Sequence, residues 1–206
     1  MRAVWKGAFF MIELIKKEIH MNRQRGTAGS QLTLDDDFIV PDALDDAVQI
    51  LLSDGEVQIE NSRIQGEKVL IRGKLVFRVL YRRESGGLQA MGGEIPFEET
   101  VNVPELSERD YTQIVWNIED LNITMIHSRK LSAKAVLTLT VRAESRVDAQ
   151  AAADVETDDA GLQVLKRSVP AATLAVRRKD IYRVREEVSV SANKPNIETI
   201  LWQEMR

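Results

Sequence analysis

Side chains that could carry chemistry are few in this sequence, and their spacing forms no catalytic or metal-binding motif. The only histidines, His20 and His127, form no H-x-x-x-H or H-E-x-x-H pair of the kind that binds zinc. Cysteine is absent, which excludes disulfides, thiolate metal sites and cysteine nucleophiles. No G-x-S-x-G elbow or phosphate-binding G-x-x-x-x-G-K-[ST] loop occurs. We therefore predict no catalytic residue, no metal, no cofactor and no enzymatic activity.

Carboxylates are abundant, but they show no ligand spacing. The triplet Asp35-Asp36-Asp37 lacks the D-x-[DN]-x-[DN]-G pattern of a calcium loop, and we interpret it as a solvated acidic turn. The other acidic residues fall at a predicted helix start, in loops or on the polar side of strands. Nothing in these positions indicates a buried pair of carboxylates with separated pKa values.

A row of cations on one predicted strand is the sharpest charged feature. The candidate partner-binding residues are Arg72, Lys74, Arg78, Arg82 and Arg83. As a functional site, this row would dock an acidic protein surface or a polyanion. As a structural feature, it is a solvated face that pairs across strands with Glu94, Glu98 and Glu99. We favour the structural interpretation, because opposite charges on neighbouring strands suffice to explain the row.

The strand that carries this row opens a long predicted β-hairpin, Lys68 to Val103. Apolar side chains from Val69 to Tyr81 share one parity, and successive side chains of a strand point to opposite faces. The run Glu84-Ser85-Gly86-Gly87 contains residues that tolerate positive φ and predicts the turn. The hairpin therefore has one apolar and one largely cationic face.

Other segments complete a mainly β chain. Alternation predicts strands at 97–103, 114–125, 131–143 and 182–190, with a bulge or tight connection near Glu119-Asp120. An apolar stripe predicts a short helix at 41–53, and residues 195–202 resemble another. Composition predicts a loop at 21–30, a polar loop or helical turn at 104–111, and an exposed loop or frayed extension at 148–161. We expect an antiparallel β-sandwich or open barrel with one or two short helices.

Composition limits the classes of partner. The chain has 206 residues, of which 44% are hydrophobic and 29% charged, as in ordinary soluble domains. Its net charge of −4 favours neither nucleic acid nor an anionic membrane. The apolar stretch from Ala3 to Ile15 is interrupted by Lys6 and Glu13 and is too short to span a membrane. We expect no nucleic acid, no membrane insertion and no signal peptide.

An internal repeat is visible when Leu34–Leu52 is placed over Val184–Trp202. Both stretches run from an acidic strand through an apolar residue to a predicted helix. This order predicts an N-terminal extension at 1–11, a β domain at 12–175 and the start of a second, truncated repeat at 176–206. The last stretch would then lack its sheet partners.

Four segments carry a resemblance to a known family. They are LTLDDDFIVPD at 32–42, VLIRGKLVFRVLYR at 69–82, EIPFEETVNV at 94–103 and HSRKLSAKAVLTLTV at 127–141. In their order and spacing the chain resembles the SPOCS domain family of SipL-like spore coat and cortex morphogenesis proteins, found in spore-forming Firmicutes. The family's P-D-x-x-P-D segment lacks its second proline in this chain, where it reads Pro41-Asp42-Ala43-Leu44-Asp45-Asp46.

The resemblance implies a noncatalytic protein–protein assembly module of the spore envelope. Its partners would be spore coat morphogenetic proteins, and its place the cytoplasm on the mother-cell side of the developing spore surface. The alternative is a β domain that binds a carbohydrate or polyanion, such as peptidoglycan or a coat polymer, through the cationic strand face. Salt distinguishes the two, since exposed charges are screened at high ionic strength.

Overall fold

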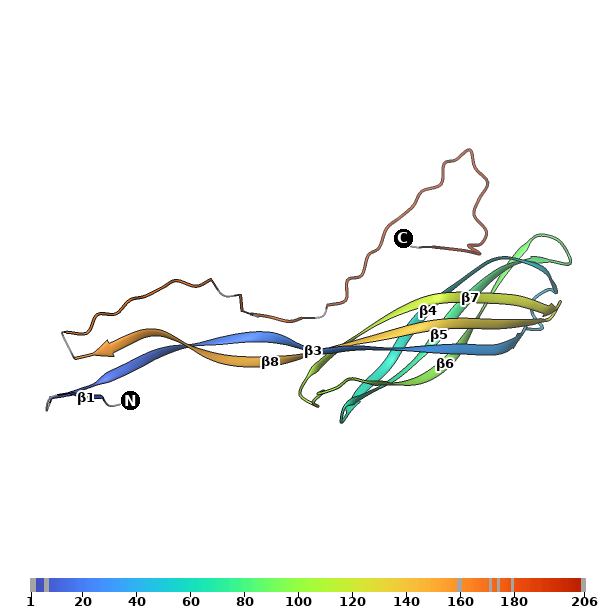
Figure 1. Cartoon of the computed structure of the whole chain (residues 1–206). Helices are drawn as coiled ribbons and strands as arrows, with labels where there is room; N and C mark the ends of the chain where they lie inside the picture. Colours follow the sequence, from blue (N-terminus) through green and yellow to red (C-terminus); the bar gives the residue numbers. More distant parts are fainter. Residues whose placement is uncertain are drawn as a thin grey trace. The chain divides into compact units, whose positions relative to one another are not determined.

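Strands form all the regular secondary structure in the part of the chain that the computed structural model describes (Figure 1). That part comprises residues 3–5, 8–158, 161–170, 172–173, 175–178 and 180–204. The strands are β1 (Ala3–Trp5), β2 (Ala8–Phe10), β3 (Ile12–Ile39), β4 (Ala47–Gln65), β5 (Lys68–Arg83), β6 (Leu88–Asn102), β7 (Tyr111–His127) and β8 (Lys130–Thr157). The chain divides into two units, Met1–Gln24 with Glu144–Tyr182, and Arg25–Ala143 with Arg183–Arg206.

The second unit is an antiparallel β-sandwich, as the sequence predicts. Its sheets have the strand orders β3-β8-β7 and β4-β5-β6, and they do not close into a barrel. β5 is the central strand of its sheet, hydrogen-bonded to β4 on one side and to β6 on the other. The cationic row therefore lies on the middle strand of a three-stranded sheet.

The predicted hairpin is confirmed as β5 and β6. Its register runs from Lys68 opposite Asn102 to Arg82 opposite Leu88 without interruption. Gly86 and Gly87 occupy the turn with φ values of 90° and 81°, a region that favours glycine because it has no Cβ.

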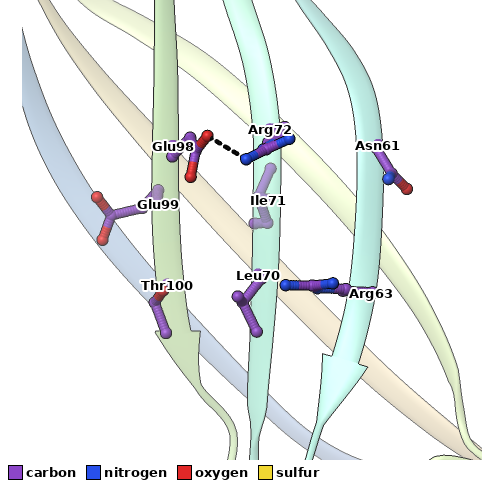
Figure 2. Close-up of a pocket in the computed structure, with 8 residues that line it drawn as sticks. All are labelled: Asn61, Arg63, Leu70, Ile71, Arg72, Glu98, Glu99 and Thr100. Atoms are coloured by element: carbon purple, nitrogen blue, oxygen red, sulfur yellow. Dashed lines mark ion pairs between the residues drawn. The ribbon is translucent and has the colours of Figure 1, made fainter.

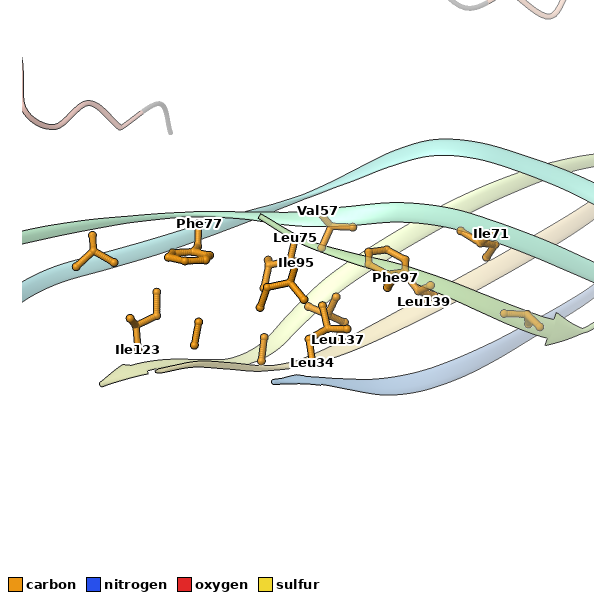
Figure 3. Packing of buried hydrophobic residues seen from close by; sticks show 14 of the residues in the cluster. Leu34, Val57, Ile71, Leu75, Phe77, Ile95, Phe97, Ile123, Leu137 and Leu139 are labelled. Carbon is orange, nitrogen blue, oxygen red and sulfur yellow. The ribbon is translucent and has the colours of Figure 1, made fainter. Parts of the chain in front are cut away.

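The core lies between the two sheets and is built from one face of each (Figure 3). The predicted apolar parity of β5 from Val69 to Tyr81 is buried, and so are the alternating residues of β8 from Leu131 to Ala143. Phe77 of β5 meets Phe38 of β3 edge-to-face, with ring centroids 4.7 Å apart. Burial of each large apolar side chain contributes roughly 1.5–3 kcal/mol, so these two strands supply much of the stability.

The predicted helix at 41–53 is wrong. Residues 42–44 form a turn, and β4 begins at Ala47. The register of β4 against β5 shifts between Ala47 and Gln49 and again between Ile50 and Leu52. Val48 and Leu51 of the apolar stripe are 41% and 42% exposed, so the spacing that suggests a helix does not mark the buried face of this strand. A helix this short is also marginal, whereas β4 gains a full ladder with β5.

The predicted loop at 21–30 and the predicted acidic turn at 35–37 are also wrong, and so is a loop over residues 148–157. Residues 159–160 of the range predicted as a loop or frayed extension lie outside the described residues. Residues 21–30 and 35–37 lie within β3, and residues 148–157 lie within β8. β3 and β8 are hydrogen-bonded neighbours, so their polar segments gain backbone partners from a strand far away in the sequence. In the first unit this pairing is accompanied by a bond of 2.7 Å between His20 Nδ1 and Asp148 Oδ1.

The predicted strand at 182–190 and helix at 195–202 are wrong. No strand or helix occurs in the described residues between 180 and 204. Ile181, Tyr182, Val184 and Val188 are each at least 86% exposed, so the apolar row has no sheet to cover it. A second copy of the domain is therefore not shown, and the boundaries at residues 11 and 175 stay a prediction.

Candidate protein-binding face

The cations of β5 lie on its outer face because the side chains of its inner face are buried in the core. Side chains from Val69 to Tyr81 on the odd positions are at most 1% exposed, apart from Gly73, which has no side chain. The even positions therefore face away from the core. Arg72 and Arg82 are exposed, while Lys74 and Arg78 are half-buried.

Acidic residues of the two neighbouring strands pair with this row. Arg72 lies 2.6 Å from Glu98 of β6, which is directly opposite it in the register. Lys74 donates to Glu94 of β6 at 2.6 Å, and this hydrogen bond raises the pKa of Lys74. These two pairs agree with the cross-strand pairing expected from the sequence.

The remaining predicted partner of the row points elsewhere. Glu99 accepts a hydrogen bond of 2.8 Å from Ser30 Oγ on β3. Its parity in β6 is opposite to that of Glu98, so it lies at the edge between the two sheets (Figure 2). The predicted pairing with Glu99 is therefore wrong.

The structure does not bring the five candidate residues together into one strip. Arg83 has the parity of Tyr81, and its guanidinium lies 3.5 Å from Asp45 at the end of the sandwich. Within the described residues, no ion pair is found for Arg82. Arg72, Lys74 and Arg78 thus form ion pairs on the outer face. Arg82 is exposed there, and Arg83 faces the other way and pairs with Asp45.

A small hollow lies beside Arg72 on the outer face (Figure 2). It encloses about 150 Å³ and is lined by three strands, with Arg63 of β4, Leu70 of β5 and Thr100 of β6 around it. Arg72 and its partner Glu98 close one side, as the dashed line in Figure 2 shows. The hollow is shallow and holds no buried titratable group, so its walls offer contacts rather than acid–base chemistry.

A second, larger groove lies next to Arg78. Its walls come from β4, β5 and β7 and from Gln203 and Glu204 of the C-terminal segment. Arg78 donates to Asp54 Oδ2 at 2.8 Å and to the carbonyl oxygen of Gln203 at 2.9 Å. The ring of Trp202 covers the same guanidinium, 4.9 Å from its central carbon. Sequence reasoning missed this site, because the tryptophans are scattered along the chain.

Arg129 forms the densest polar cluster of the second unit. Its guanidinium donates to Asp46 at 2.8 Å, to Asp42 at 3.1 Å, and to the carbonyl oxygens of Val40 and Leu44 at 3.0 and 3.3 Å. Hydrogen bonds from Arg129 and Ser128 lower the pKa of Asp46. Arg129 therefore joins the turn between β7 and β8 to the connection between β3 and β4.

This cluster unites two of the segments that carry the family resemblance. Pro41–Asp46 is the variant P-D-x-x-P-D segment, and Arg129 belongs to the run Ser128-Arg129-Lys130-Leu131-Ser132. The sequence contains both motifs but gives no sign that they touch, since they lie far apart along the chain. Their contact indicates that both motifs serve the architecture of the sandwich.

The other titratable side chains occupy supporting positions. His127 Nδ1 lies 3.2 Å from the backbone nitrogen of Arg129 and accepts its hydrogen bond in the turn. Across the described residues, no group of three or more His, Asp or Glu side chains is arranged to hold a metal ion. In the same part of the chain, no helix has the length and hydropathy needed to cross a membrane.

These observations define an antiparallel β-sandwich module whose outer face is crossed by ion pairs and by the C-terminal segment. Residues 46–126 match the family model SipL, SPOCS domain. The resemblance seen in the sequence is thus confirmed for one copy, from the start of β4 to the end of β7. The match indicates a sporulation-related module. Comparison with curated proteins and with solved structures gives no match.

Proposed function

We propose that this chain is a noncatalytic assembly module of spore envelope morphogenesis that binds spore coat morphogenetic proteins. The observation that carries the proposal is the match of residues 46–126 to the SipL SPOCS domain. That range contains β4, β5, β6 and nearly all of β7, and so supplies the small hollow, the outer face of β5 and the strand walls of the groove beside Arg78. Its place would be the mother-cell side of the developing spore surface.

Exposed apolar side chains on an edge strand support contacts with proteins. β7 is the outer strand of its sheet, and Val115, Trp116, Met125 and Ile126 on it are between 38% and 52% exposed. An edge strand with accessible apolar side chains can add a strand from a partner or pack against an apolar surface. The charge pairing of β5 favours this mode over capture of a polyanion, because three of the cations are already neutralised by neighbours.

Capture of purified coat morphogenetic proteins on the immobilised chain tests the proposal. We expect capture to persist at roughly 0.5 M salt, where exposed charges are screened over a few Å. A Val115→Lys variant places a charge on the β7 edge and should weaken capture. An Ile39→Lys variant is the matched control, since it places the same charge on an exposed side chain of β3, the opposite outer strand of that sheet, and it should bind normally.

The alternative makes opposite predictions. A polyanion- or peptidoglycan-binding domain would be retained on purified peptidoglycan without any coat protein, and about 0.5 M salt would release it. It would also be more sensitive to Arg72→Ser than to Val115→Lys. Either result would replace the assembly proposal.

A further inference from the structure

The C-terminal segment meets the sandwich beside Arg78. Trp202 is half-buried, whereas the described residues from 183 to 201 are exposed throughout. The indole of Trp202 lies 4.9 Å from the central carbon of the Arg78 guanidinium, and the carbonyl oxygen of Gln203 accepts a hydrogen bond of 2.9 Å from the same group. Gln203 and Glu204 then form part of the wall of the groove.

The segment shares this groove with apolar side chains of two strands. Val76 of β5 and Trp116 of β7 line the groove together with Gln203 and Glu204. Val76 is half-buried and Trp116 is 38% exposed. The position of the segment therefore decides how much of this apolar wall another molecule can reach.

The attachment is weak because the rest of the segment adds little to it. No strand or helix occurs in the described residues from 183 to 204, and Val184 and Val188 are 90% and 86% exposed. One cation–π contact and one hydrogen bond from a charged donor must offset the conformational entropy of the residues that they order. We expect the attached form to be favoured on the order of tenfold, which leaves a detached population.

Arg78 keeps its position when the segment detaches. Asp54 lies opposite Arg78 in the β4–β5 register and accepts a hydrogen bond of 2.8 Å from its Nη2. The contact with Trp202 uses the face of the guanidinium, and the bond to Gln203 uses Nη1. Because neither contact competes with Asp54, the segment can leave and return without a change in the sheet.

We propose that the Trp202–Glu204 segment is a reversible cover, held by Arg78 of its own chain, that limits access to the groove wall at Val76 and Trp116. The inference rests on the proposed function for its biological use, since Trp116 is one of the β7 side chains that would contact a coat protein. Such a partner binds the detached form, so its apparent affinity is lowered by the fraction of chains that are covered.

Thiol labelling measures the cover directly, because the chain contains no cysteine of its own. Val76→Cys places one thiol on the groove wall, and its rate of reaction with N-ethylmaleimide is read by mass spectrometry of the intact chain. Adding Trp202→Ala should raise this rate about three- to tenfold, because labelling no longer waits for detachment. Trp202→Phe keeps an aromatic ring and should give an intermediate rate, since indole attracts a cation best.

Two controls separate the cover from a general loosening of the fold. Leu70→Cys places a thiol on the same outer face of β5, beside the small hollow, and Trp202→Ala should leave its rate unchanged. Ile197→Ala removes a segment side chain that is 62% exposed and should not change the rate at Val76→Cys. Equal labelling of Val76→Cys with and without Trp202 would overturn the inference, and so would an equal rise at Leu70→Cys.

Capture of purified coat morphogenetic proteins tests the use of the cover. Trp202→Ala should bind such a protein about three- to tenfold more tightly than the wild type. Equal affinity of the two chains would overturn control of the site by the cover. Capture by neither chain would refute the proposed function instead, and thiol labelling of the purified chain would still decide whether the cover exists.

Discussion

Two segments of this chain carry the same alternation of apolar and polar residues, and only one of them is a strand. From Leu131 to Ala143 the alternating side chains of β8 are at most 1% exposed. From Tyr182 to Val190 the alternating side chains remain exposed and no strand forms. β8 lies between β3 and β7, whereas the later segment has no neighbouring strand. Alternation thus shows which side chains a strand would bury, and a neighbour decides whether the strand forms.

Paired alanine substitutions give the largest expected difference between these segments. Leu137→Ala removes a fully buried side chain of β8 and should lower the free energy of unfolding by about 2–5 kcal/mol. Val188→Ala changes a side chain that is 86% exposed and should alter it by less than about 0.5 kcal/mol. Equilibrium urea unfolding of both variants measures the contrast. A similar loss for Val188→Ala would show that the later segment is folded against a sheet.

The sequence was informative where the signal was local. The β5–β6 hairpin follows from a two-residue period and a pair of glycines, which act over a few neighbours. The parity switch near Glu119-Asp120 is real, since Ile118 and Leu121 both pack against the core, and β7 continues through it.

Long-range pairing accounts for the failures. Residues 21–30 and 148–157 have the composition of loops, but β3 and β8 supply each other's backbone partners. In the stretch predicted as a helix at 41–53, Val48 and Leu51 of the apolar stripe stay exposed, and the buried face of β4 is set by register shifts that only the β4–β5 ladder defines.

The candidate site shows the same division. The outward direction of Arg72, Lys74 and Arg78 follows from parity, and parity also explains why Arg83 does not join them. By contrast, the contacts of Arg78 with Trp202 and of Arg129 with Asp46 join positions far apart along the chain. The alternation of residues along a strand cannot predict such contacts.

Glycine substitutions test how closely the folded region is packed. A Cβ at Gly73 would lie 2.6 Å from the carbonyl oxygen of Gln58 and 2.8 Å from the Phe97 ring. Since the backbone of β4 must move, Gly73→Ala should cost about 1–3 kcal/mol. Gly26→Ala is the control, because its Cβ would meet Val103 at an ordinary 3.5 Å. Thermal unfolding should show no loss for Gly26→Ala, and an equal loss for both would disprove the packing argument.

The Arg129 cluster should contribute less than the core and more than the exposed pairs. Arg129→Met keeps the length of the side chain but removes one of the two donors to Asp46 and a donor to two backbone carbonyls, so the urea midpoint should fall. Asp46→Asn should do the same, with a dependence on pH. The folded pKa of Asp46 lies below its ordinary value of 3.8, because Arg129 and Ser128 donate hydrogen bonds to the carboxylate.

The sign of that dependence follows from the lowered pKa. The carboxylate stabilises the fold fully above its unfolded pKa of 3.8, and this contribution is lost as the pH falls through the lower folded pKa. The difference in urea midpoint between wild type and Asp46→Asn should be constant near neutral pH and shrink below about pH 3.8. A difference that stays constant through this range would exclude the carboxylate–Arg129 bond as its cause.

The smallest effect is expected from the exposed ion pair on the outer face of β5. Arg72 and Glu98 are 66% and 69% exposed, and water screens a pair at such a surface. A double-mutant cycle with Arg72→Ser and Glu98→Gln should give a coupling of about 0.2–1 kcal/mol in dilute buffer and less at high salt. The triple variant Arg72→Ser, Lys74→Ser, Arg78→Ser should keep the β-sheet circular dichroism of the wild type. If that variant unfolds, the three cations are needed for the stability of the sheet, and the outer face of β5 is not a free binding surface.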